Sequence, residues 1–328
     1  MKKFLNETDS MLQEALAGMA CAHAGILQVH MDPTYVCRAA PSRRPKVALL
    51  SGGGSGHEPL HVGFVGQGML DAACPGQIFT SPTPDQMIAA ATAVETGKGV
   101  LLIVKNYAGD LMNFEMASEM LEVENETVLV NDDVAVDNST HTTGRRGVAG
   151  TLMVEKMVGA AAEAGADLQQ CKELGDRVNK ATASMGIAFT SCTVPAAGRE
   201  TFDIGADEME VGVGIHGEPG RRRERLQRAD VIVDELLTAI IRDLNPCAGS
   251  EVLLHVNGFG ATPLMELYLL QHRAEAQLRS LGFKPARFLV GNYTTSLEMA
   301  GASLTVTVLD SELKQLWDAP VHTAALRW

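Results

Sequence analysis

The sequence of 328 residues carries a net charge of −13, with 46% hydrophobic and 5% aromatic residues. This length predicts about two domains, and the hydrophobic content is sufficient for a large core. The acidic charge argues against binding to nucleic acid or to anionic lipid.

The N-terminus, the apolar runs and the cysteines bear on the location of the protein in the cell. No apolar leader follows the N-terminus, because Asn6 and Glu7 come directly after Phe4-Leu5; we expect no signal peptide and a cytoplasmic protein. No apolar run is long enough to predict a transmembrane helix. The six cysteines form no metal-ligand spacing and are expected to be reduced.

The first half of the chain alternates between strand and helix patterns. These patterns predict helices at residues 9–28, 85–95 and 112–122, and strands at 46–50, 99–104 and 127–130.

The second half begins after a helical, alanine-rich stretch at residues 148–183. It predicts strands at 186–189, 209–214, 252–256, 287–290 and 304–309, and helices at 229–243 and 262–281. We therefore expect an α/β protein of two α/β domains. The first, residues 1–184, should hold a largely parallel sheet flanked by helices, and the second, residues 185–310, should be smaller.

A glycine-rich segment follows the strand at 46–50 and ends in His57-Glu58-Pro59. We call residues 51–59 the first glycine loop. Glycine allows close approach of the backbone to a ligand, and histidine titrates near neutral pH. The loop lacks the Lys-Ser/Thr of a P-loop and the spacing of a dinucleotide-binding loop, so nucleotide binding is not expected. The alternative is that the glycines only form tight turns.

Asp110 and Lys105 follow the next apolar strand, at 99–104. Ligands bind at the carboxyl ends of strands in open α/β sheets, so His57 and Asp110 could act together as general base and orienting group on a hydroxyl. The alternative for Asp110 is a helix N-cap.

His216 lies in a second glycine loop, residues 212–220, which also continues into Glu-Pro. This setting makes His216 a candidate functional residue, whereas the other seven histidines lack such glycines and are interpreted as structural. Asp132 and Asp133 are interpreted as a solvated turn rather than a metal site. The arginines at 145–146 and 221–225 are interpreted as solvated loops, with docking of an acidic partner or phosphate as the alternative for the second cluster.

Taken together, several segments resemble the dihydroxyacetone kinase K-subunit (DhaK) family. The matching segments follow one another along nearly the whole chain: residues 46–60, 76–85, 99–114, 132–136, 144–148, 191–198, 208–220, 256–268, 291–301 and 317–322. Ala108 departs from the family pattern, in which Thr is common at this position.

The resemblance implies specific roles for the candidate residues. His216 would form a covalent hemiaminal with the C2 carbonyl of dihydroxyacetone. His57 and Asp110 would contact the substrate hydroxyls, and either could deprotonate the attacking one. The backbone around Gly54, Ser55 and Gly56 and the Lys105 side chain would complete the pocket.

Covalent capture would also explain selectivity. A neutral imidazole adds to a ketone carbon but not to the alcohol carbon of glycerol, so ketoses or aldoses are selected over polyols.

The resemblance also implies partners. We expect no nucleotide-binding domain and no cofactor on this chain. ADP or ATP and Mg²⁺ are expected on a separate L-type subunit, which would draw its phosphate from the phosphotransferase system. A homodimer is implied, with the C-terminal tail, residues 311–328, packed on the first domain. Two other functions stay open: a dihydroxyacetone-sensing coactivator of a transcription regulator, and a kinase subunit for another short sugar such as erythrulose.

Overall fold

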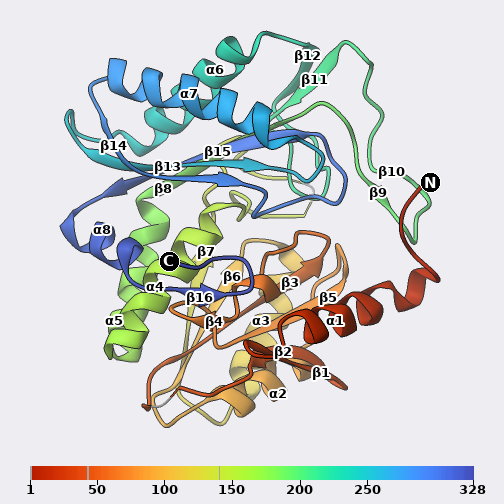
Figure 1. The fold of residues 1–328 in the computed structure, drawn as a ribbon, viewed down its shortest axis with the longest axis vertical. Coiled ribbons are helices and arrows are strands. Elements are labelled where there is room, and N and C mark those ends of the chain that lie inside the picture. The colour runs from red at the N-terminus through yellow and green to blue at the C-terminus, as the bar shows by residue number, and fades with distance from the viewer. Residues whose placement is uncertain (1, 43, 140) are drawn as a thin grey trace.

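The computed structural model describes residues 2–42, 44–139 and 141–328. Its two six-stranded sheets lie one above the other in Figure 1, with helices between and outside them. The two-sheet α/β architecture predicted from the sequence is confirmed. Among the described residues, no helix combines the length and the apolar character needed to cross a bilayer.

The first sheet is parallel at its centre. Its strand order is β1 (Leu27–Met31), β2 (Thr34–Arg38), β5 (Ala72–Ile78), β3 (Ala48–Ser55), β6 (Val100–Lys105) and β7 (Asn125–Val130). Strands β5, β3, β6 and β7 are parallel neighbours, and all six residues of β6 are buried. A continuous apolar run is typical of a strand that is covered on both faces.

Helices cover both faces of this sheet. Alternate residues of β3 and β6 pack against α2 (Pro84–Val94) and α3 (Ala108–Met120) on one face. Their other residues pack against α4 (Gly150–Ala164) and α5 (Leu168–Lys180). This alternation follows from the two-residue repeat of a strand.

The N-terminal helix is shorter than the sequence pattern predicts. After a short 3-10 helix, η1 (Thr8–Ser10), α1 spans Met11–Ala22, and the chain then turns into the antiparallel hairpin of β1 and β2. The prediction of one helix over residues 9–28 is therefore wrong at its end. Gly25 lies in the turn, and pairing with β2 stabilises residues 27–31 as a strand.

The second sheet is mainly antiparallel. Its order is β12 (Arg222–Arg225), β11 (Glu208–Val211), β8 (Thr182–Ala188), β15 (Gly301–Leu309), β13 (Glu251–Gly258) and β14 (Lys284–Gly291), and only β13 and β14 run parallel. Helices α6 (Ala229–Leu244) and α7 (Leu264–Ser280) cover its outer face. The inner face of β8 and β15 is polar, with Thr182 and Ser184 paired to Thr307 and Thr305 at 2.9 and 2.7 Å between hydroxyl oxygens.

The C-terminal segment returns to the first sheet. Helix α8 (Ser311–Asp318) packs on α4, and β16 (His322–Thr323) pairs with β4 (Gly66–Gln67), close to η2 (Val62–Phe64). Trp317 and Leu326 join the same apolar cluster as α4.

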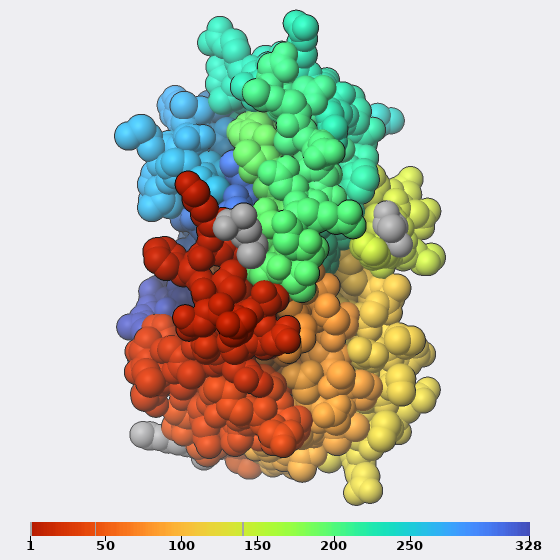
Figure 2. Space-filling model, turned by 90° about the vertical axis from the view of Figure 1, so that its right-hand side faces the viewer, coloured from red at the N-terminus to blue at the C-terminus, as the bar shows by residue number. Residues whose placement is uncertain are grey.

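The N-terminal segment also contacts the second half of the chain. The hairpin of β9 (Thr193–Val194) and β10 (Arg199–Glu200), in green, extends beside the N-terminal segment (Figures 1 and 2). Glu298 accepts from the Thr193 amide and pairs with Lys3.

Candidate active site

The two glycine loops meet, although 159 positions separate their histidines in the sequence. The imidazole rings of His57 and His216 pack edge to face with centroids 4.7 Å apart. Phe79 stacks on His57 with an interplanar angle of 12° and meets His216 edge-on. Tyr107, just before α3, closes a further side of His216 with centroids 4.6 Å apart. The arrangement leaves His216 partly accessible and His57 buried.

The orientation of His57 is fixed by the second part of the chain. Its Nδ1 lies 2.7 Å from the carbonyl oxygen of Thr295. A carbonyl can only accept, so Nδ1 carries the hydrogen and Nε2 keeps a lone pair. Burial, followed by the electrostatic influence of the neighbouring His216 and Lys105, lowers the pKa of His57 well below its usual value. His57 is therefore a neutral imidazole with a free acceptor nitrogen.

His216 is oriented by Glu218, two residues further on. The carboxylate lies 2.9 Å from His216 Nδ1 and accepts from the His216 amide at 2.9 Å. Burial alone would raise the pKa of Glu218, but His216 and Arg146 outweigh it and lower this pKa to about 2. Because an ionised carboxylate accepts from Nδ1–H, Nε2 of His216 is the nitrogen left for chemistry.

Asp110 lies in the first turn of α3, close to the first glycine loop. Its Oδ2 is 3.6 Å from Lys105 Nζ. The first glycine loop approaches Lys105 most closely at Gly53, where a Cβ would collide with the Nζ atom. The N-cap of α3 is Tyr107, so Asp110 is not the N-cap that the alternative interpretation required.

Two of the buried polar atoms without a partner belong to residues predicted for the site. In the part of the chain that the structure describes, His57 Nε2 and Asp110 Oδ1 lack any hydrogen-bond partner. Buried polar atoms are nearly always paired, so such atoms indicate a place for a ligand.

The remaining residues predicted for the pocket have mostly structural contacts. Ser55 Oγ donates to the Gly76 carbonyl at 2.7 Å, and the Gly56 amide donates to Glu58 at 3.0 Å. Gly54 packs so closely on residues 79–80 that a Cβ would lie 2.6 Å from the Thr80 nitrogen. This close approach positions Phe79 beside His57.

Asp132 and Asp133 are buried, so their interpretation as a solvated turn is wrong. Asp132 accepts from the amides of Val148 and Gly150, at 2.8 and 2.7 Å. Asp133 accepts from Arg146 Nε at 2.8 Å. These bonds stabilise the loop that leads into α4.

Arg146 is also buried, which corrects its interpretation as part of a solvated loop, whereas Arg145 is half-buried. Arg146 Nη2 donates to the Gly212 carbonyl at 2.6 Å, which ties the Asp133 loop to the second glycine loop. In the cluster at 221–225, Arg221 donates to the Val134 and Ala135 carbonyls, and Arg222 pairs with Glu224 and Glu235.

Sequence reasoning missed several residues of the site. Glu218 stands in the His-Gly-Glu-Pro motif, and its spacing from His216 was the available signal. His61, interpreted as structural, contacts Lys105. Phe79, Tyr107 and Thr295 carry no local signal, because only the tertiary fold brings them to the histidines.

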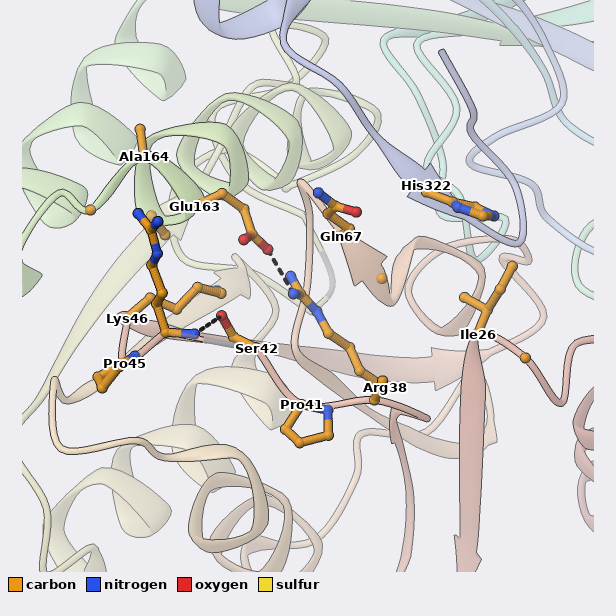
Figure 3. Close-up of a pocket in the computed structure, with 16 residues that line it drawn as sticks. Ile26, Arg38, Pro41, Ser42, Pro45, Lys46, Gln67, Glu163, Ala164 and His322 are labelled. Atoms are coloured by element: carbon orange, nitrogen blue, oxygen red, sulfur yellow. Dashed lines mark hydrogen bonds and ion pairs between the residues drawn. The ribbon is translucent and has the colours of Figure 1, made fainter.

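A cleft of about 650 Å³ lies away from the two histidines (Figure 3). It is lined by Lys46, which precedes β3, whereas His57 follows β3, so the cleft lies at the opposite end of that strand. Arg38 pairs with Glu163 at 2.6 Å and Lys46 with Asp71 at 2.5 Å. These cations already have partners, so the histidine site is the stronger candidate for chemistry. Within residues 2–42, 44–139 and 141–328, no cluster of three potential metal ligands occurs.

Comparison with known proteins shows the family of the chain. The Dak1 domain model matches residues 17–325. The chain is 48% identical to the dihydroxyacetone-binding subunit DhaK of the PEP-dependent dihydroxyacetone kinase of Escherichia coli K12, covering 100% of this chain and 99% of the relative.

Two solved structures share the fold at 32% sequence identity. The dihydroxyacetone kinase operon co-activator DhaQ superposes with a TM-score of 0.90 over 98% of both chains. The dihydroxyacetone kinase of C. freundii superposes with a TM-score of 0.88 over 98% of this chain and 60% of that one.

Proposed function

Because this chain belongs to the Dak1 domain family, we propose that it is the dihydroxyacetone-binding subunit of a dihydroxyacetone kinase. It binds the ketone between the two glycine loops and presents a terminal hydroxyl for phosphorylation by a partner subunit. The observation that carries this proposal is the pair of unpartnered buried atoms, His57 Nε2 and Asp110 Oδ1, beside the accessible His216.

Capture begins at His216. Its Nε2 lone pair forms a bond to the C2 carbonyl carbon, and the carbonyl π electrons move to oxygen, which takes up a proton. The proton that leaves Nδ1 balances the one that the oxygen gains, so the product is a neutral hemiaminal. Glu218 accepts from Nδ1–H and stabilises the positive charge that develops on the ring.

Phosphoryl transfer requires an oriented, deprotonated hydroxyl. His57 Nε2 and Asp110 Oδ1 are both acceptors, and either can take the proton as the oxygen attacks phosphorus. The covalent bond to His216 holds this oxygen in place for in-line attack. Gly54, Ser55, Gly56 and Lys105 complete the pocket in this proposal.

The phosphoryl group comes from a nucleotide held by an L-type subunit with Mg²⁺, and we propose that this chain contributes no nucleotide site. The K subunit is proposed to act as a cytoplasmic homodimer. Light scattering of the purified chain tests the dimer, since a monomeric mass at micromolar concentration would contradict it.

The kinase proposal is tested by mixing the chain with an L-type subunit, a phosphoryl donor and dihydroxyacetone, and measuring dihydroxyacetone phosphate. Erythrulose in a parallel reaction tests the second sugar. The 0.90 TM-score to a co-activator favours a sensor as the second candidate function. Adduct formation on His216 without product from either sugar would support the sensor and contradict the kinase.

A further inference from the structure

A chain of buried polar side chains extends behind the site, away from the substrate. It begins at Glu155, which is fully buried in α4 among apolar neighbours. A buried carboxylate is costly unless it is paired. Its Oε1 lies 2.6 Å from His61 Nδ1. The contact joins the interior helix to the segment that follows the first glycine loop.

The hydrogen on His61 can be assigned from its neighbours. Ser51 Oγ donates to the Ile103 carbonyl at 2.7 Å, so at His61 Nδ1, 3.0 Å away, this hydroxyl can only accept. Nδ1 therefore carries the hydrogen and donates to Glu155 and Ser51. The other ring nitrogen, Nε2, is left as an acceptor.

Lys105 supplies the donor that Nε2 requires. Its Nζ lies 2.8 Å from His61 Nε2, 3.3 Å from the Gly52 carbonyl and 3.6 Å from Asp110 Oδ2. An ammonium group can donate but cannot accept, so Nζ donates to His61 Nε2 and to the Gly52 carbonyl and forms an ion pair with Asp110. The far oxygen of Asp110, Oδ1, is the unpartnered atom of the proposed site.

We propose that His61 and Glu155 are positioning residues that hold Lys105 as a cation beside Asp110, so that Asp110 stays an ionised acceptor towards the substrate. The inference rests on the proposed function, since it concerns the same site. Glu155 contacts His61 and His61 contacts Lys105, so both residues act on Asp110 through Lys105.

The charges around this chain of contacts decide the expected pH effect. Asp110 from α3 and Glu155 from α4 are the acidic groups that face Lys105, and His61 and His57 are the neighbouring imidazoles. Burial raises the pKa of Glu155 to about 8, partly offset by the charge of Lys105. Burial, Lys105 and His57 lower the pKa of His61 well below its usual value. Glu155 is therefore ionised only above about pH 8, and in that range its removal leaves less negative charge to stabilise the Lys105 cation.

The first test compares Glu155→Gln with the wild type in the complete assay with an L-type subunit. Glutamine keeps the shape and can still accept from His61 Nδ1. We expect the alkaline limb of kcat against pH to move to lower pH by roughly one unit, while the His216 adduct still forms in intact mass spectra. A pH profile that superposes on that of the wild type would overturn the inference.

A pair of His61 variants provides a second test, should Glu155→Gln not fold. His61→Gln keeps both an acceptor and a donor, and we expect kcat within a few-fold of wild type. His61→Leu removes both, and we expect kcat to fall at least tenfold. The matched control is His255→Leu, because His255 is a fully buried histidine in the second sheet that faces the Leu289 carbonyl.

The outcomes separate the two proposals. Wild type that forms no product contradicts the kinase function itself. Active wild type with equal losses in His61→Gln and His61→Leu, or with the same loss in His255→Leu, overturns the positioning role.

Discussion

The carbonyl oxygen of Thr295 lies 2.7 Å from Nδ1 of His57, although 238 positions separate the two residues in the chain. This hydrogen bond joins the loop after β14 to the first glycine loop and selects the tautomer of His57. The free acceptor nitrogen, Nε2, is therefore oriented by a residue from the other half of the chain.

His216→Ala should abolish covalent capture of dihydroxyacetone, because no other histidine of the described site presents a partly exposed ring. Intact mass spectrometry after incubation with the ketone measures the adduct. His272→Ala, at an exposed position of α7, is the control and should retain it. An adduct of unchanged yield on His216→Ala would contradict the assignment.

Asp110→Asn should retain the adduct and lose turnover. The amide is nearly isosteric but cannot take up the hydroxyl proton, and loss of a general base typically lowers kcat by ~10²–10⁴-fold. The assay is dihydroxyacetone phosphate formation with an L-type subunit. Turnover within a few-fold of the wild type would assign the base to His57 instead.

Glu218→Gln should be less stable than the wild type at neutral pH, and the difference should narrow in acid. The pKa of Glu218 is lowered from 4.5 to about 2 in the folded protein, so its ionised form stabilises the fold above about pH 4.5. This contribution, at most ~3 kcal/mol by linkage, declines as the pH falls from about 4.5 towards 2. Urea unfolding of both proteins between pH 7 and pH 3 measures it, and a constant difference would contradict it.

Arg146→Met should destabilise the protein by ~3–5 kcal/mol, because it leaves Asp133 as a buried carboxylate without its partner. Arg145→Met is the matched control at the adjacent position. Arg145 is 36% exposed and pairs with Asp243 on the surface, so its loss should cost ~1 kcal/mol or less. Free energies of unfolding in urea provide the comparison. Equal decreases in this free energy for the two variants would show that the burial of Arg146 does not contribute to stability.

Much of the fold could be predicted from local pattern. The apolar run that forms β6 and the Pro84 that begins α2 are local signals, and the structure has both elements within one or two residues of their expected bounds. The hairpin of β1 and β2 could not be separated from α1 by periodicity, because strand pairing rather than intrinsic preference stabilises it.

The sequence by itself determined which residues could carry chemistry: two histidines in glycine loops, and Asp110 after an apolar strand. Only the tertiary structure decided how they meet. Thr295 and Glu218 fix the two imidazoles, and Arg146 and Asp133 pair inside the molecule rather than in solvent. The physical reason is that a side chain's ionisation and hydrogen-bond partners depend on burial and on neighbours distant in sequence, whereas periodicity reports only the local backbone.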